Sequence, residues 1–180
     1  MKVHIEHVQR ILGIAGSLRR GSFNRSLLRA AQEFAAISIY DELGQIPLVN
    51  EDVGGGEAVD RLRKAIASAD GVLFATPEYN WSIPGVLKNA IDWLSLPPNQ
   101  VLIGKPVAII GATPGRGATR LAQSALRQVL TATESIVMPA PALFIQQADK
   151  AFDAGALIDD AYRAQLFAVI DGFSKWIGRF

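Results

Sequence analysis

Short, strongly apolar segments alternate along this chain with segments whose apolar residues recur every three or four positions. The apolar segments predict buried strands at 10–15, 37–40, 71–75, 107–111 and 136–138, the last either alone or joined by 143–145. The amphipathic segments predict helices at 26–36, 57–68, 83–94 (capped by Ser82), 119–132 and 159–178. Such alternation is typical of a parallel sheet covered by helices. We therefore expect an α/β fold: a doubly wound, five-stranded parallel sheet of order 2-1-3-4-5 with helices on both faces.

Size and composition narrow the class of protein further. At 180 residues, the chain is expected to form one domain over residues 1–180. It contains no cysteine, which excludes disulfides and thiolate catalysis and is compatible with a cytoplasmic location. The net charge of +1 gives no sign of the excess positive charge with which proteins bind nucleic acid or an anionic membrane. No apolar run approaches the roughly 20 residues of a membrane span, and the charged first residues do not resemble a secretory signal.

The turn between the first predicted strand and the first predicted helix is rich in hydroxyl, amide and guanidinium groups. A turn in this position points backbone N–H groups and the positive end of the helix dipole at a bound anion. Its candidate ligands are Ser17, Arg19, Ser22, Phe23 and Asn24. Ser22 and Asn24 also suit a plain helix cap, whose geometry is the same. The turn predicts a phosphate-binding loop.

The spacing of glycines decides which phosphate-bearing cofactor is expected. Gly13, Gly16 and Gly21 do not match the G-x-G-x-x-G pattern of dinucleotide sites, although Asp41 and Glu42 follow the second strand, where such sites place an acid. The chain also lacks the Gly-Lys-Ser/Thr sequence of a P-loop. A compact loop of hydroxyl, amide and guanidinium groups suits a single terminal phosphate, as in FMN.

Two further loops, at 76–82 and 113–118, follow the third and fourth predicted strands, where doubly wound sheets bind ligands. Tyr79 or Trp81 offers an aromatic surface for a flavin ring, and backbone N–H groups from Glu78 to Asn80 are expected near N5 and O4. Arg116 is a candidate for the N1 and O2 edge or for a solvated charge. The complete set of candidates in these two loops is Pro77, Glu78, Tyr79, Asn80, Thr113, Pro114, Gly115 and Arg116.

These motifs together carry a family resemblance. Gly-Ser-Leu-Arg-x-Gly-Ser-x-Asn followed by Thr-Pro-Glu-Tyr-Asn-x-Ser-x-Pro-Gly-x-Leu-Lys-Asn-Ala-Ile-Asp-Trp-Leu resembles the flavodoxin-like NAD(P)H-dependent FMN reductases, in the branch of quinone, chromate and azo-dye reductases. The resemblance implies FMN, reduction by NADH or NADPH, and a homodimer or homotetramer with the flavin near the neighbouring subunit. It places the phosphate on Ser17, Arg19, Ser22 and Asn24, and the ring on the loop 77–80. Two departures are Gly117-Ala118, where relatives often have Gly-Gly, and Trp81, at a variable position.

The reaction implied by this resemblance is a transfer of hydride from nicotinamide to flavin N5. The electrons then pass to a quinone, an azo compound, free flavin or a metal oxyanion such as chromate. Because the flavin carries the chemistry, no protein acid or base is expected to be catalytic. No metal site is expected, with His4 and His7 lacking a carboxylate cluster. The alternatives left open are a non-enzymatic FMN-binding electron carrier, a Rossmann-type dehydrogenase and a regulatory flavodoxin-like protein.

Overall fold

The computed structural model describes residues 8–180, in which six parallel strands form one central sheet. The strands are β1 (Ile11–Ala15), β2 (Ile37–Tyr40), β3 (Gly71–Ala75), β4 (Pro106–Ala112), β5 (Ile136–Val137) and β6 (Leu143–Ile145). Their order is β2-β1-β3-β4-β5, with β6 also paired to β4. The predicted strand order is confirmed.

The last strand position is divided between two short strands. β5 pairs with the start of β4, and β6 pairs with its end. Between them, Pro139 and Pro141 lack the backbone N–H that a continuous ladder requires. Both segments considered in the sequence therefore contribute to the sheet, as separate strands.

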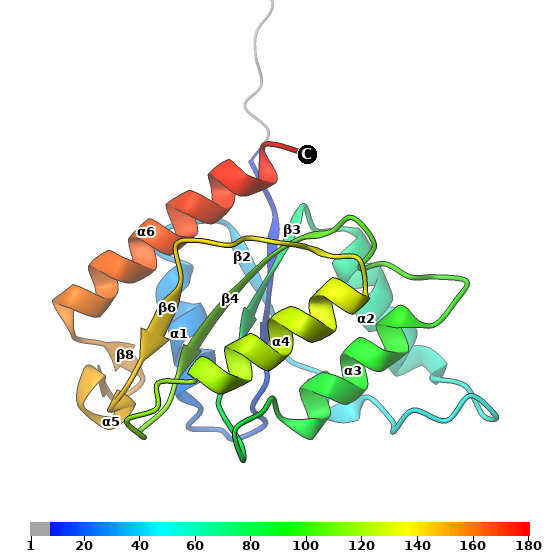
Figure 1. Ribbon diagram of the computed structural model, residues 1–180, viewed down its shortest axis with the longest axis horizontal. Coiled ribbons are helices and arrows are strands. Elements are labelled where there is room, and N and C mark those ends of the chain that lie inside the picture. The colour runs from blue at the N-terminus through cyan, green and yellow to red at the C-terminus, as the bar shows by residue number, and fades with distance from the viewer. Residues whose placement is uncertain (1–7) are drawn as a thin grey trace, which may run out of the picture.

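Helices cover both faces of the sheet (Figure 1). The main helices are α1 (Phe23–Ala31), α2 (Gly56–Ala67), α3 (Gly85–Ser95), α4 (Arg120–Ala132) and α6 (Asp160–Ile177). Smaller elements are the 3-10 turn η1 (Leu43–Gln45), the short helix α5 (Ala148–Ala151) and the antiparallel pair β7 (Phe152–Asp153) and β8 (Ala156–Leu157). Side chains from α1 and α6 pack on one face of the sheet, and those from α2, α3 and α4 pack on the other. No helix among residues 8–180 is long and apolar enough to cross a membrane.

Three predicted helix boundaries are wrong. The first helix begins at Phe23 because the Ser22 hydroxyl accepts the N–H of Arg25 at 3.3 Å and caps it. It ends at Ala31, and the Gln32 amide then donates to the carbonyl of Ile37 at 2.8 Å, which leads the chain into β2. The third helix is not capped by Ser82: its N-cap is Pro84, because Ser82 belongs to a tight turn.

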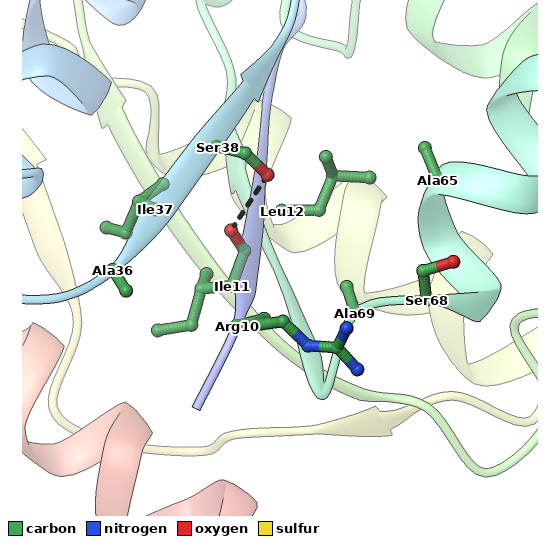
Figure 2. Close-up of a pocket in the computed structure, with 9 residues that line it drawn as sticks. All are labelled: Arg10, Ile11, Leu12, Ala36, Ile37, Ser38, Ala65, Ser68 and Ala69. Atoms are coloured by element: carbon green, nitrogen blue, oxygen red, sulfur yellow. Dashed lines mark hydrogen bonds between the residues drawn. The ribbon is translucent and has the colours of Figure 1, made fainter. Parts of the chain in front are cut away.

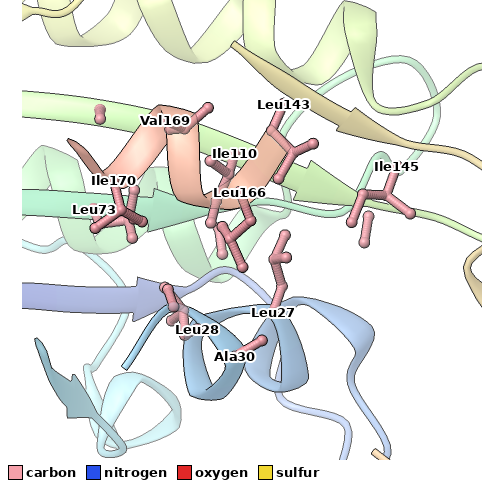
Figure 3. Close-up of a cluster of buried hydrophobic side chains, with 14 of the residues drawn as sticks. Leu27, Leu28, Ala30, Leu73, Ile110, Leu143, Ile145, Leu166, Val169 and Ile170 are labelled. Atoms are coloured by element: carbon pink, nitrogen blue, oxygen red, sulfur yellow. The ribbon is translucent and has the colours of Figure 1, made fainter. Parts of the chain in front are cut away.

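Each face of the sheet carries its own apolar core. Figure 3 shows the core in which Leu27 and Leu28 of α1 meet Leu166 and Ile170 of α6 over the central strands. All four side chains are at most 1% exposed, and burial of a leucine or isoleucine contributes about 1.5–3 kcal/mol. Alternate residues of β1, β3 and β4 point into the opposite core.

The segment after β2 is fastened to α3 by polar contacts. The side-chain amide of Asn89 donates to the carbonyl of Pro47 and accepts the N–H of Val49, both at 2.8 Å. The indole N–H of Trp93 also donates to Pro47, at 2.8 Å. This segment displays Leu48, which is 83% exposed. Asn89 and Trp93 thus hold a surface loop in place from the third helix.

Candidate functional site

Three loops meet at the carboxyl edge of the sheet, which lies at the bottom of Figure 1. The pairing of neighbouring strands places these loops together. The N–H of Gly16 donates to the carbonyl of Ala75 at 2.9 Å, and the N–H of Thr76 donates to the carbonyl of Ile110 at 3.0 Å. The N–H of Thr113 donates to Ile145 at 3.0 Å. The loops after β1, β3 and β4 therefore start at the same level, at the point where strand order reverses.

The loop after β1 leads directly into the amino terminus of α1. The first N–H groups of a helix have no intrahelical acceptor. The Ser22 hydroxyl takes the N–H of Arg25, which leaves those of Phe23 and Asn24 for a ligand. Arg19 and Arg20 are exposed, and within residues 8–180 neither forms an ion pair. These donors and charges are those that an anion requires.

Asn24 has a different role from the one suggested by its place in the loop. Its side chain is 2% exposed. The side-chain N–H donates to the carbonyl of Ala112 and its oxygen accepts the N–H of Ala112, both at 2.9 Å. The amide therefore ties α1 to the end of β4, and the backbone N–H is what Asn24 offers to a ligand.

The loop after β3 contains a type I′ turn. The N–H of Tyr79 donates to the carbonyl of Ser82 and the N–H of Ser82 to that of Tyr79, both at 3.0 Å. Between them, Asn80 and Trp81 have φ values of 48° and 64°. Because the N–H of Tyr79 is engaged, Glu78 and Asn80 provide the backbone donors of this loop. Trp81 lies at its tip, 78% exposed.

Side chains of this loop also reach the two neighbouring loops. The Tyr79 hydroxyl lies 3.5 Å from that of Ser17, and the Tyr79 ring is 46% exposed. The carboxylate of Glu78 accepts the N–H groups of Leu121 and Ala122, at 2.9 and 3.0 Å. Pro77 is buried where a Cβ on Gly16 would lie 3.4 Å from its ring. The three loops therefore form one connected surface.

The loop after β4 exposes its candidate residues to solvent. Pro114, Gly115 and Arg116 are exposed, and Arg116 forms no ion pair within the described part of the chain. Thr113 is partly buried, and its hydroxyl accepts the N–H of Gly115 at 3.3 Å. Small residues and one unpaired cation leave room here for a flat ligand.

A cluster of three buried polar side chains lies beneath these loops. Thr76, Thr119 and Gln123 are each at most 1% exposed. The Gln123 side-chain N–H donates to the hydroxyl of Thr119 at 3.2 Å and to the carbonyl of Leu143 at 2.9 Å. A Cβ on Gly111 would lie 2.3 Å from the Thr119 hydroxyl. Sequence reasoning missed this group, although a glycine within an apolar strand is a recognised sign of close approach.

Comparison with known proteins agrees with this geometry. The family model described as NADPH-dependent FMN reductase matches residues 9–150. An NAD(P)H-dependent FMN reductase of Pseudomonas aeruginosa is 46% identical over 177 residues, covering 94% of this chain and 96% of its own. A 2-hydroxy-1,4-benzoquinone reductase of a Burkholderia species is 38% identical over 175 residues, covering 93% and 96%. The chain belongs to the NADPH-dependent FMN reductase family.

A solved structure supports the same conclusion for this reductase. FerB, an NAD(P)H:acceptor oxidoreductase of Paracoccus denitrificans, superposes with a TM-score of 0.88 at 35% identity. The match covers 96% of the reductase and 98% of FerB. The flavodoxin-like fold and the family predicted from the two motifs are confirmed.

The polar groups of the reductase fit the phosphate end of FMN. The α1 amino terminus provides free backbone donors, and Arg19 and Arg20 provide positive charge that no ion pair within residues 8–180 neutralises. The nearby carboxylates are already engaged: Asp41 pairs with Arg25, and Glu42 accepts from the guanidinium of Arg61 at 2.7 Å. Both acids considered as ribose ligands are thus held by arginines of the reductase itself.

Among the cavities of the described residues, two bear on where the cofactor site lies. One, of about 230 Å³, adjoins the loop after β1, between Ser17 and the Arg25–Asp41 pair. The Tyr40 hydroxyl at its wall is buried with no hydrogen-bond partner among residues 8–180, and burial, then the charge of Glu42, raises the pKa of Tyr40. The other, of about 500 Å³, lies at the opposite edge of the sheet, where the Ser38 hydroxyl donates to the carbonyl of Ile11 (Figure 2).

The larger cavity is not where we place the cofactor site. Small and apolar residues form most of its walls, with Arg10 as the one charged residue among those that line it. It lies at the amino ends of the strands, whereas doubly wound sheets bind their ligands at the carboxyl ends. No cluster of three potential metal ligands occurs in the part of the reductase that the structure describes, and His4 and His7 lie outside it.

Proposed function

We propose that this reductase binds FMN on the three loops at the carboxyl edge and uses NADPH or NADH to reduce quinones. The observation that carries the proposal is the amino terminus of α1, where free N–H groups lie beside two arginines that form no ion pair within the described part of the chain. The names of the two similar enzymes, an FMN reductase and a benzoquinone reductase, support the same reaction.

Each loop has a part in holding the cofactor under this proposal. The phosphate contacts are Ser17, Arg19, Ser22, Phe23 and Asn24, the last two through their backbone N–H groups. The ring contacts are Pro77, Glu78, Tyr79 and Asn80 on one side, and Thr113, Pro114, Gly115 and Arg116 on the other. Their charge and donors favour the negative charge of a reduced ring.

Bound FMN would supply the hydride chemistry, from nicotinamide to the electron acceptor. The chain's own residues bind and orient it: Arg19 neutralises phosphate charge, and the N–H groups of Glu78 and Asn80 offer donors to the ring edge. The exposed ring of Tyr79 provides a surface for stacking. No side chain is assigned as an acid or base, because the proposal requires none.

The acceptor range and the assembly belong to the same proposal. We include azo compounds, free flavin and chromate as acceptors beside quinones, since an open ring face accepts many oxidants. We also propose self-association to a dimer or tetramer, supported by Leu48 and Trp81, which are 83% and 78% exposed. The proposed location is the cytoplasm, with which the absence of cysteine is compatible.

The deciding experiment is an anaerobic titration of the purified protein after incubation with FMN. We expect a flavin absorption spectrum that survives gel filtration, bleaches on addition of NADPH or NADH and returns when a benzoquinone is added. Bound flavin that neither nucleotide reduces would instead indicate an electron carrier or a regulatory protein. A colourless protein that binds no FMN would contradict the proposal.

A further inference from the structure

The helix α4 is capped by a residue from another loop. Its own N-cap residue, Thr119, makes no side-chain capping bond. The carboxylate of Glu78 instead accepts the N–H groups of Leu121 and Ala122, at 2.9 and 3.0 Å. A carboxylate at this end of a helix satisfies free donors and complements the helix dipole. Glu78 thereby joins the loop after β3 to the helix that follows β4.

This contact connects two loops that both contain strained backbone. On one side of Glu78, Asn80 and Trp81 have φ values of 48° and 64°. At the start of α4, Ala118 and Thr119 have φ values of 54° and 56°. Residues other than glycine keep such conformations only where surrounding contacts hold them. Because Glu78 belongs to the first of these loops and its carboxylate bonds to the first turn of α4, it is well placed to hold their separation.

The same residue offers a ligand donor from its backbone. The Glu78 N–H lies in the proposed ring-binding loop, while its side chain is fixed at α4. A Cβ on Gly117, in the loop across the site, would lie 3.7 Å from the second Glu78 carboxylate oxygen. The side chain therefore spans the gap between the two loops that would contact the ring.

We propose that Glu78 is a positioning residue: by capping α4, its carboxylate fixes the two ring-binding loops relative to each other and so tunes FMN affinity and the flavin's reduction potential. This inference rests on the proposed function, because it requires FMN between these loops. Under this inference, the side chain of Glu78 bonds to the protein, and its backbone N–H bonds to the cofactor.

The test compares Glu78→Ala and Glu78→Gln with a matched control, Asp159→Ala. Asp159 caps α6 in the same manner, its carboxylate accepting the N–H of Tyr162 at 2.9 Å, but it contacts neither ring loop. FMN dissociation constants are measured by fluorescence quenching, midpoint potentials against reference dyes, and melting temperatures on the cofactor-free proteins.

We expect Glu78→Ala to raise the FMN dissociation constant roughly 5-fold, the factor for a lost cap of ordinary strength. The midpoint potential should shift to a more negative value, because the backbone donors that stabilise the reduced ring are no longer held in place. Glu78→Gln keeps an acceptor oxygen and should recover most of the affinity. Asp159→Ala should lower the melting temperature but leave affinity and potential unchanged.

Two results would overturn the inference. One is a wild-type affinity and potential in Glu78→Ala; the other is an equal loss of affinity in Glu78→Ala and Asp159→Ala. If Glu78→Ala does not fold, Glu78→Asp decides: it keeps the charge but its shorter side chain withdraws the carboxylate from the N–H groups of Leu121 and Ala122, so the FMN affinity should still fall, and a wild-type affinity would overturn the inference. A wild-type protein that binds no FMN contradicts the proposed function itself, so the two failures are distinct.

Discussion

Arg19 stands beside the free donors of α1, and the fold provides no carboxylate partner for its guanidinium among residues 8–180. Replacement by alanine should weaken FMN binding by about 1.5–3 kcal/mol, the range for a hydrogen bond to a charged group. Isothermal titration calorimetry measures this directly. Arg179→Ala, at the far end of the last helix, is the control and should bind as the wild type does. An unchanged dissociation constant for Arg19→Ala would remove Arg19 from the site.

Gly111 is a second residue whose identity is set by its surroundings. An added Cβ would lie 2.3 Å from the Thr119 hydroxyl and 2.6 Å from the carbonyl oxygen of Thr76. Since one of these atoms is backbone, relief requires the loops to move, and we expect Gly111→Ala to reduce the free energy of unfolding by about 3 kcal/mol. Urea denaturation of the apoprotein gives the value. In contrast, Gly85→Ala meets no atom within 4 Å and should be neutral or slightly stabilising. Equal stabilities for the two variants would contradict this steric argument.

At the scale of elements, α6 is joined to the segment after α1 by an ion pair. The guanidinium of Arg163 donates to the carboxylate of Glu33 at 2.7 Å. This hydrogen bond, reinforced by the charge of Arg163, lowers the pKa of Glu33 below its ordinary 4.5. Because the folded pKa lies below the unfolded one, the pair stabilises the fold fully above about pH 4.5 and loses its effect as pH falls through the lowered pKa.

An NMR titration of the Glu33 side-chain carboxyl carbon should therefore show a lowered pKa, which returns toward 4.5 in Arg163→Ala. Both side chains are solvent-exposed, so the accompanying change in unfolding free energy should be small and should shrink further with added salt. A Glu33 pKa that is the same with and without Arg163 would show that the pair does not form in solution.

The strands of this fold were predicted well because short apolar segments bounded by polar turns leave little choice of position. Residues 71–75 match β3 at both ends. Helix ends were less predictable, because they depend on contacts made after folding. Gln32 turns the chain by bonding to Ile37, and Ser82 is drawn into the Tyr79 turn instead of capping α3.

The candidate site also has features that the sequence predicts and features that it does not. The sequence places all three loops at one edge of the sheet, since the carboxyl ends of neighbouring parallel strands lie together. It does not reveal that the Asn24 amide bonds to Ala112 or that the Glu78 carboxylate reaches α4. Each contact joins segments that follow different strands, and its geometry depends on strand register, which local sequence does not encode.

On the scale of the whole molecule, the two cores share the central strands. Neighbouring residues of β3 point to opposite sides: Leu73 belongs to the core under α1 and α6, and Phe74 to the core under α2 and α3. Neither core can lose its sheet face without exposing the other. We therefore propose that the chain behaves as one domain and unfolds in a single transition.

Tryptophan fluorescence can test this because each core has a reporter. Trp93 is buried in the core under α2 and α3, and Trp176 packs against the core under α1 and α6. In Trp81→Phe/Trp176→Phe and Trp81→Phe/Trp93→Phe variants, the fluorescence and circular dichroism midpoints in urea should coincide within each protein. Separate midpoints for fluorescence and circular dichroism in either variant would show that the two halves unfold independently.

The bond between Asn24 and Ala112 also orders events during synthesis. These residues are 88 positions apart, so the amide finds its partner only after β4 has been translated and has left the ribosome. Until then, α1 lacks the end of β4, to which Asn24 ties it in the folded protein. A nascent chain should therefore stay incompetent to capture FMN until more than half of it has emerged, even though the segment that we propose to contact the phosphate is among the first parts made.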